Sequence, residues 1–198
     1  MDVDFRRTRF LKSAAALSDL PPDTGREVAF AGRSNSGKSS ALNIIAGIKG
    51  LARVSKTPGR TQLINLFTVA DAQRFVDLPG YGYAKVPEAV RAGWNRLMED
   101  YFSSRQALVG LVLVMDIRRP LTDFDASMLA WVAPLNLSVL ALLNKADKLS
   151  RSTALGVQSK VASELGRRAQ VQVFSALSGY GVEEAREVIA GWFADGRM

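Results

Sequence analysis

The sequence contains neither cysteine nor histidine. Without cysteine the chain cannot form disulfides, iron–sulfur clusters or thiolate zinc sites, and it has no cysteine nucleophile. Without histidine a Ser-His-Asp triad and imidazole metal ligands are excluded as well. Any metal ion bound by this chain must therefore be held by oxygen atoms.

Long apolar runs are also missing. No stretch approaches the roughly 18 consecutive apolar residues that a membrane-spanning helix needs. The N-terminus lacks the apolar core of a secretory signal, because Asp2, Asp4 and four basic residues between positions 6 and 12 interrupt it. With 198 residues, 47% of them hydrophobic and 23% charged, the sequence is typical of a single globular domain. We therefore expect a cytoplasmic protein without a membrane span.

Acidic residues are absent between Val28 and Ala70, although the whole chain carries a net charge of +7. The same stretch holds six basic residues: Arg33, Lys38, Lys49, Arg53, Lys56 and Arg60. A segment with charge of one sign indicates a surface that contacts phosphate, as in nucleic acids. The alternative is a solvated basic face without a partner.

Apolar runs alternate with amphipathic segments along most of the chain. The pattern predicts strands at 27–31, 63–69, 74–78, 108–115, 139–143 and 171–174, and helices at 38–48, 123–133, 153–165, 182–193 and from Pro87 onward. The short segment 70–73 between the runs 63–69 and 74–78 favours a hairpin. We expect a three-layer α/β fold in which a mostly parallel six-stranded sheet, with one antiparallel strand, has helices on both faces. A ligand should then bind at the carboxyl ends of the strands.

A glycine-rich motif follows the first predicted strand. Residues 32–39 read Gly-Arg-Ser-Asn-Ser-Gly-Lys-Ser, the pattern of a phosphate-binding loop. The glycines let the backbone N–H groups point at phosphate oxygens, and the next helix adds its positive N-terminal end. Lys38 would reach the β- and γ-phosphates and Ser39 would ligate Mg²⁺. A glycine-rich turn without a ligand is the alternative.

Two motifs at later strand ends indicate which base is bound. Residues 144–147 read Asn-Lys-Ala-Asp, and the Asp147 carboxylate can accept hydrogen bonds from N1–H and the 2-amino group of guanine, which adenine cannot donate. Lys145 would lie over the base, Asn144 would tie this loop to the phosphate loop, and the segment 174–176 would offer an N–H to guanine O6. The alternative for Asp147 is a helix cap.

A further motif, Asp77-Leu78-Pro79-Gly80, lies between these two. A carboxylate at Asp77 can hold Mg²⁺ through water, and the Gly80 N–H can contact the γ-phosphate. Such contacts would couple the following loop to the nucleotide state. By itself the motif could also be a simple turn.

Together these motifs resemble those of the translation-associated GTPases of the TrmE–Era–EngA class, and within it the EngB family of ribosome-biogenesis GTPases. The resemblance rests on residues 32–40, 56–62, 77–84, 144–147 and 174–176, and it spans roughly residues 5–193. The stretch Asp-Leu-Pro-Gly-Tyr-Gly-Tyr-Ala at 77–84 is its most particular part.

The resemblance implies an N-terminal extension at 1–24 packed on a single G domain at 25–198. It implies GTP or GDP with Mg²⁺ as ligands, and action in assembly of the large ribosomal subunit, through ribosomal RNA and protein, with a link to cell division in some members. The Mg²⁺ ligands would be Ser39, Thr61 and Asp77, with Thr57 as the alternative to Thr61. The nucleotide contacts that it assigns are Gly32, Arg33, Ser34, Asn35, Ser36, Gly37, Lys38, Ser39, Ser40, Gly59, Arg60, Thr61, Gln62, Leu63, Asp77, Leu78, Pro79, Gly80, Asn144, Lys145, Ala146, Asp147, Phe174, Ser175 and Ala176.

Catalysis would depend on Lys38, Thr61, Gly80 and Asn35. Tyr81 stands where Ras-type enzymes have a water-positioning glutamine, so hydrolysis should be slow. Asn35 stands where related GTPases hold K⁺, an ion that can replace an arginine finger electrostatically. The alternative for Asn35 is a hydrogen bond within the loop.

Three functions are compatible with these features. The chain could be a slow GTPase that acts as an assembly switch, a GTP/GDP-gated RNA- or protein-binding module with incidental hydrolysis, or a P-loop phosphotransferase. The guanine motif disfavours the third. We expect a monomer that binds guanine nucleotides and the large ribosomal subunit or its precursors.

Overall fold

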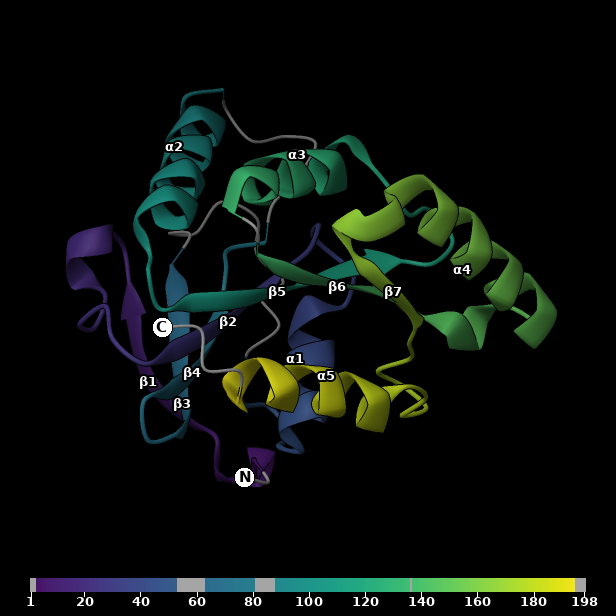
Figure 1. Ribbon diagram of the computed structural model, residues 1–198, viewed down its shortest axis with the longest axis horizontal. Coiled ribbons are helices and arrows are strands. Elements are labelled where there is room, and N and C mark those ends of the chain that lie inside the picture. The colour runs from purple at the N-terminus through teal and green to yellow at the C-terminus, as the bar shows by residue number, and fades with distance from the viewer. Residues whose placement is uncertain (1–2, 53–62, 81–87, 136, 195–198) are drawn as a thin grey trace.

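A computed structural model describes residues 3–52, 63–80, 88–135 and 137–194. In it one β-sheet lies between two layers of helices (Figure 1). The helices are α1 (Lys38–Ala46), α2 (Glu88–Ser104), α3 (Asp123–Val132), α4 (Arg151–Leu165) and α5 (Val182–Ala194). The strands are β1 (Arg9–Ala14), β2 (Arg26–Ala31), β3 (Ile64–Ala70), β4 (Gln73–Asp77), β5 (Leu108–Asp116), β6 (Ser138–Asn144) and β7 (Gln170–Val173).

The strand order is β1-β3-β4-β2-β5-β6-β7, a seven-stranded sheet. Strands β4, β2, β5, β6 and β7 are parallel, and β3 is antiparallel to both of its neighbours, β1 and β4. The predicted hairpin and the one antiparallel strand are thus confirmed. The predicted number of six strands is wrong, because β1 adds a seventh strand at the edge of the sheet. Residues 9–14 show no alternation of apolar and polar residues, so the sequence pattern did not indicate this strand.

The core lies in two clusters, one on each face of the sheet. Side chains of α2, α3 and α4 pack on one face, and those of α1 and α5 pack on the other (Figure 1). The interior strand β5, next to the central strand β2, is apolar on both sides, and from Leu111 to Val114 its side chains are completely buried. Continuous apolar runs of this kind suit a parallel strand that is covered on both faces. The aromatic residues Trp94, Tyr101 and Phe102 of α2 are buried in this core.

A buried carboxylate fastens the start of β2 to its surroundings. Glu27 is completely buried and accepts hydrogen bonds from Arg74 of β4, at 2.8 Å, and from Arg105 after α2, at 2.7 Å. Asp23 accepts hydrogen bonds from the N–H groups of Gln106 and Ala107. These contacts hold the chain before β2 against the end of α2.

Candidate nucleotide-binding site

The phosphate-loop motif connects β2 to α1 as predicted. Gly37 precedes α1 with φ of +93°, a left-handed conformation that favours glycine. A Cβ atom on Gly32 would lie 2.6 Å from Ser36 Oγ and 2.7 Å from the Val114 carbonyl oxygen of β5. Glycine at this position therefore lets the loop lie directly against β5.

The backbone of this loop is poised to donate hydrogen bonds. Within the described part of the chain, the N–H groups of Gly37, Lys38 and Ser39 have no acceptor. The Ser36 hydroxyl is buried and has no hydrogen-bond partner among the described residues. Such unpaired groups at the start of a helix form a site for an anion.

Lys38 and Asp77 form an ion pair across the carboxyl ends of β2 and β4. Asp77 is only 5% exposed, and the next residue, Leu78, donates its N–H to the Phe30 carbonyl at 3.0 Å. The structure thus brings Asp77 to the phosphate loop, as predicted from the sequence. The side chain of Leu78 is buried in the core, and the adjacent Pro79 is buried as well, so these two residues can face a ligand chiefly through their backbone.

Asn144 joins the phosphate loop to the loop after β7. Its side-chain amide, in a residue that is 2% exposed, donates to the Ser36 carbonyl at 2.8 Å and accepts from the Ala176 N–H at 3.0 Å. The Asn144 side chain also approaches Gly37 so closely that a Cβ there would collide with it. The tie between the two loops that the sequence predicted is therefore present.

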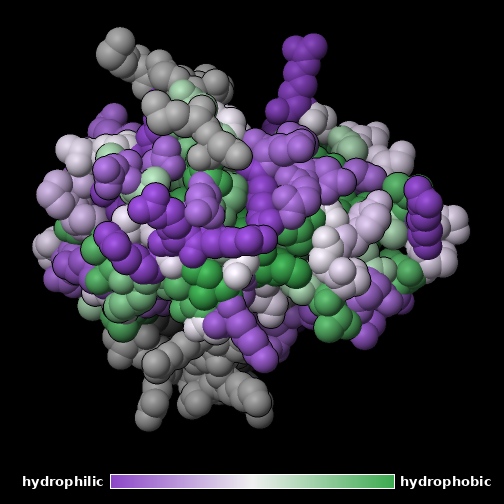
Figure 2. All heavy atoms as spheres, turned by 90° about the horizontal axis from the view of Figure 1, so that it is seen from below, coloured by the Kyte–Doolittle hydropathy of each residue, from purple (hydrophilic) through white to green (hydrophobic). Residues whose placement is uncertain are grey.

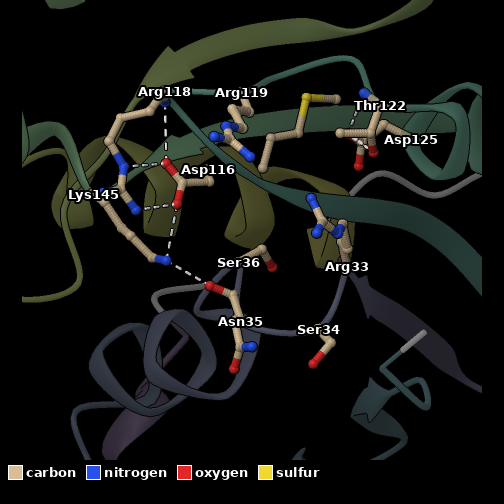
Figure 3. Close-up of a pocket in the computed structure, with 11 residues that line it drawn as sticks. Arg33, Ser34, Asn35, Ser36, Asp116, Arg118, Arg119, Thr122, Asp125 and Lys145 are labelled. Atoms are coloured by element: carbon tan, nitrogen blue, oxygen red, sulfur yellow. Dashed lines mark hydrogen bonds and ion pairs between the residues drawn. The ribbon is translucent and has the colours of Figure 1, made fainter. Parts of the chain in front are cut away.

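Lys145 connects the loop after β6 to the phosphate loop and to the end of β5. It adopts a left-handed conformation, with φ of +68°, and its ammonium group donates to the Asn35 carbonyl at 2.5 Å and to Asp116 at 2.9 Å. Asp116 also accepts hydrogen bonds from Arg118 (Figure 3). The Arg118 guanidinium, and secondarily Lys145, hold the pKa of Asp116 well below its usual range.

Asp116 was missed by the sequence analysis, which ended the strand one residue before it. Together with Arg33, Ser34, Asn35, Ser36 and Lys145 it lines a cavity of about 450 Å³ (Figure 3). Thr122 and the buried Asp125 lie on the opposite side of this cavity. Burial raises the pKa of Asp125.

Asp147 and Ser175 meet at the next strand end. The Ser175 hydroxyl donates to the Asp147 carboxylate at 2.7 Å, and this hydrogen bond lowers the pKa of Asp147. The Ala146 N–H donates to the Phe174 carbonyl at 3.1 Å. Asp147 itself is exposed, whereas the Phe174 side chain lies in the core. Asp147 and Ser175 line a second cavity, of about 260 Å³.

Several predicted site residues cannot be placed. Gly59, Arg60, Thr61, Gln62, Thr57 and Tyr81 lie outside the described residues. Gly80 and Leu63, at the margins of these gaps, are half-buried, and Ser40 is exposed on α1. Ser39 lies in the first turn of α1, beside Lys38. Within the described ranges no three or more acidic side chains gather into a metal cluster.

Comparison with known proteins places the chain in a family. Residues 27–145 match the family model described as 50S ribosome-binding GTPase. The chain is 50% identical to a GTP-binding protein EngB of Escherichia coli over 98% of this chain and 94% of that protein, and it matches the Shigella boydii EngB protein equally well. The chain belongs to the EngB family of GTPases. The resemblance seen in the sequence is thereby confirmed.

Solved structures show the same fold. The crystal structure of an EngB protein has a TM-score of 0.68 at 22% identity, with 84% of this chain and 98% of that chain covered. Aquifex aeolicus Era has a TM-score of 0.67 at 20% identity, with 88% and 58% covered. The EngB fold is thus a P-loop GTPase domain. No helix in the described ranges has the length and apolar character to cross a membrane.

Proposed function

We propose that this EngB-family GTPase is a guanine-nucleotide switch that hydrolyses GTP slowly and acts in assembly of the large ribosomal subunit. The observation that carries the proposal is the link made by Asn144, which holds the phosphate loop and the base-side loop together through two hydrogen bonds. A ligand that fits both loops at once carries phosphates at one end and a base at the other.

The phosphate end of the site is built from residues of the loop and α1. The unpaired N–H groups of Gly37, Lys38 and Ser39 would bind phosphate oxygens, and Lys38 would exchange Asp77 for the β- and γ-phosphates. The buried Ser36 hydroxyl, which lacks a partner among the described residues, supports a ligand in this loop. Arg33, Ser34, Asn35 and Ser40 would complete the cradle.

The donors near the loop fit Mg²⁺, an ion that prefers oxygen ligands. Ser39 and Asp77 lie on neighbouring elements, and we propose that they and Thr61 hold it, Asp77 through water. Bound there, Mg²⁺ would neutralise charge on the phosphates. We assign Lys38, Thr61, Gly80 and Asn35 to the catalytic step, in which Lys38 stabilises phosphate charge and Gly80 donates its N–H to the γ-phosphate.

Guanine would be read at the ends of β6 and β7. The hydrogen bond from Ser175, and secondarily the ion pair of Oδ2 with Lys148 at 3.3 Å, lower the pKa of Asp147, and guanine would compete with the exposed Lys148 for this carboxylate. Lys145, held by Asn35 and Asp116, would lie along the base, and the Ala176 region would face its O6. Adenine has no donors to satisfy this carboxylate.

Competition titration tests this assignment. The protein should bind GTP and GDP but not ATP, and Asp147→Asn should shift the preference toward xanthine nucleotides, because an amide can donate to the 2-oxygen of xanthine. Equal affinities for ATP and GTP would refute guanine specificity.

Rates in K⁺ and Na⁺ test the catalytic proposal. If the Asn35 amide helps to hold K⁺ beside the phosphates, hydrolysis should be faster in K⁺ than in Na⁺, and Asn35→Ala should abolish the difference while GDP binding persists. Equal wild-type rates in the two salts would assign Asn35 a structural role.

The ribosomal role is tested by sedimentation with purified 50S subunits. Binding should differ between GDP and a non-hydrolysable GTP analogue, and equal sedimentation with both nucleotides would refute a switch. Turnover with and without these subunits separates the assembly GTPase from the second candidate, a gated binding module whose hydrolysis is incidental: the GTPase should be accelerated, and the module should not.

A further inference from the structure

The N-terminal edge of the sheet carries a cluster of basic side chains that the nucleotide site does not use. It is formed by η1 (Phe5–Arg7), by β1 and by the turn after α1. We call it the N-terminal basic patch, and its members are Arg6, Arg7, Arg9, Phe10, Leu11, Lys12 and Lys49. The N-terminus lies at the lower side of the domain in Figure 1, and the view from that side shows groups of hydrophilic residues interspersed with hydrophobic ones (Figure 2).

Within the part of the chain that the structure describes, no carboxylate forms an ion pair with the five basic side chains of the patch. By contrast, Arg74, Arg105, Arg118 and Arg186 all form ion pairs. Arg6, Arg7, Arg9 and Lys49 are exposed, and Lys12 is partly exposed. Unpaired cations grouped on one edge attract a polyanion.

The patch is fixed in place, which distinguishes it from a solubilising tail. Phe5 is buried and stacks on Phe75 with ring centroids 5.7 Å apart. Asp4 accepts a hydrogen bond from the Arg6 N–H, and the Thr8 hydroxyl donates to the Phe5 carbonyl at 2.6 Å. The Arg6 stem lies against the end of α1, where a Cβ on Gly47 would be 3.3 Å from Arg6 Cγ.

An exposed aromatic ring lies on the same edge strand. Phe10 pairs with Phe67 on the α1/α5 face of the sheet, whereas Arg9 and Lys12 belong to the opposite face. Phe10 is 56% exposed, and its neighbour Leu11, the residue at the β-bulge, is 44% exposed. One edge contact with Phe67, with centroids 5.9 Å apart and an angle of 72°, orients the Phe10 ring without covering it. A fixed, open aromatic ring on an edge strand that also carries basic side chains is suited to stacking on an unpaired base.

We infer that the N-terminal basic patch binds RNA of the large ribosomal subunit along this edge of the sheet, with Arg6 and Arg7 on phosphates, Arg9 on phosphates from the other face of β1, and Phe10 stacked on an unpaired base. This inference rests on the proposed function for the identity of the RNA. Exposed apolar side chains alone would suit a protein partner equally well. The five unpaired cations favour RNA, because burying them against a neutral protein surface would leave them uncompensated.

The first experiment measures binding of a fluorescently labelled single-stranded RNA of 20 uridines as a function of salt, with GDP present. The triple variant Arg6→Gln/Arg7→Gln/Arg9→Gln should lower the slope of log K against log salt by about 2, since each single-strand phosphate contact contributes about 0.7. The matched control is Arg151→Gln/Lys160→Gln/Arg167→Gln, which removes three exposed charges from α4 and the turn after it, at the other edge of the sheet. This control should keep the wild-type slope. Equal slopes for the two triple variants would overturn the inference.

A second pair of variants tests the aromatic contact. Phe10→Ala should weaken binding of the same RNA by roughly tenfold. Phe10→Leu should weaken it similarly while retaining apolar packing against Phe67, so its thermal unfolding should stay near that of the wild type. Wild-type RNA affinity in Phe10→Leu would overturn the stacking contact.

Co-sedimentation with 50S subunits separates this inference from the proposed function. If the triple patch variant sediments like the wild type, the patch is overturned while the switch proposal stands. The other outcome combines the two experiments. If the triple patch variant no longer sediments with 50S subunits, and the wild type does not bind the oligouridine RNA, the surface contacts a ribosomal protein and the RNA inference is overturned. Failure of the wild-type protein to bind GTP would refute the proposed function, whatever the patch binds.

Discussion

Replacing Asn144 by alanine is expected to destabilise the domain and loosen the nucleotide site. The Asn144 amide is 2% exposed and makes two hydrogen bonds, with the Ser36 carbonyl and the Ala176 N–H. Alanine leaves both backbone groups without this partner, at a cost of about 1–3 kcal/mol each. The free energy of unfolding should therefore fall by about 3 kcal/mol. For a chain of this size that loss lowers the midpoint of thermal unfolding by roughly 6–12 °C.

Nucleotide affinity should fall in the same variant, because the two loops no longer hold each other in place before the ligand arrives. A further ordering cost of about 1.4 kcal/mol corresponds to tenfold weaker binding of GDP. Asn144→Thr serves as the matched variant, since a hydroxyl group can replace one of the two hydrogen bonds, and both losses should be about half as large.

Thermal unfolding followed by circular dichroism gives the first loss, and titration with a fluorescent GDP analogue below the unfolding range gives the second. The reasoning fails if Asn144→Ala unfolds at the wild-type temperature. It also fails in its second part if GDP affinity stays at the wild-type value while stability falls, since Asn144 would then support the fold without organising the site.

Other predictions concern the charged groups. Lys38→Ala should abolish GDP binding in fluorescence titration and, by leaving buried Asp77 without its cation, lower the free energy of unfolding by about 3–5 kcal/mol; adding Asp77→Asn should restore stability but not binding. Because the folded-state pKa of Asp147 is lowered, this group stabilises the protein above its unfolded pKa, and that contribution is lost as the pH falls through the folded pKa. Ser175→Ala should raise the pKa of Asp147, which an NMR titration of its carboxyl carbon would detect. Glu27→Gln should leave half-buried Arg74 without its counter-charge and Arg105 with Asp23 alone, and cost about 3 kcal/mol in a urea unfolding experiment.

Regular patterns in the sequence were sufficient for most of the fold. The helix at α1 begins at Lys38 as predicted, and the hairpin of β3 and β4 turns at Asp71 and Ala72. Strand β1 escaped prediction for a physical reason. It is an edge strand with three exposed residues at its start, so burial imposes no alternation on it. Its pairing with β3, such as that of Arg9 with Thr68, joins residues far apart in the chain.

In the site, too, features encoded by consecutive residues could be predicted, whereas features that depend on contacts between distant residues could not. The phosphate loop could be located because its glycines and lysine are consecutive in the sequence, and the structure places Asn144 and Asp77 beside it. Asp116 could not be assigned in this way, because its role depends on contacts with Lys145 that exist only after folding. A single carboxylate at the end of an apolar strand, such as Asp116, is a weak sequence signal. It can be assigned to the site only once the structure shows that Lys145, which follows the next strand, reaches it.

The two halves of the site differ in what a nucleotide would have to change. On the base side, Lys145 and Asn144 already make the hydrogen bonds that fix their positions, so binding there costs little reorganisation. On the phosphate side, Lys38 is paired with Asp77, and a phosphate must compete with that carboxylate for the ammonium group. Because Asp77 ends β4 and Gly80 follows three residues later, the release of Asp77 acts directly on the chain that leaves this strand. In the proposed binding mode, a nucleotide that engages Lys38 would change the end of β4, whereas its base would meet a surface already in place, and this asymmetry is what the proposed switch requires.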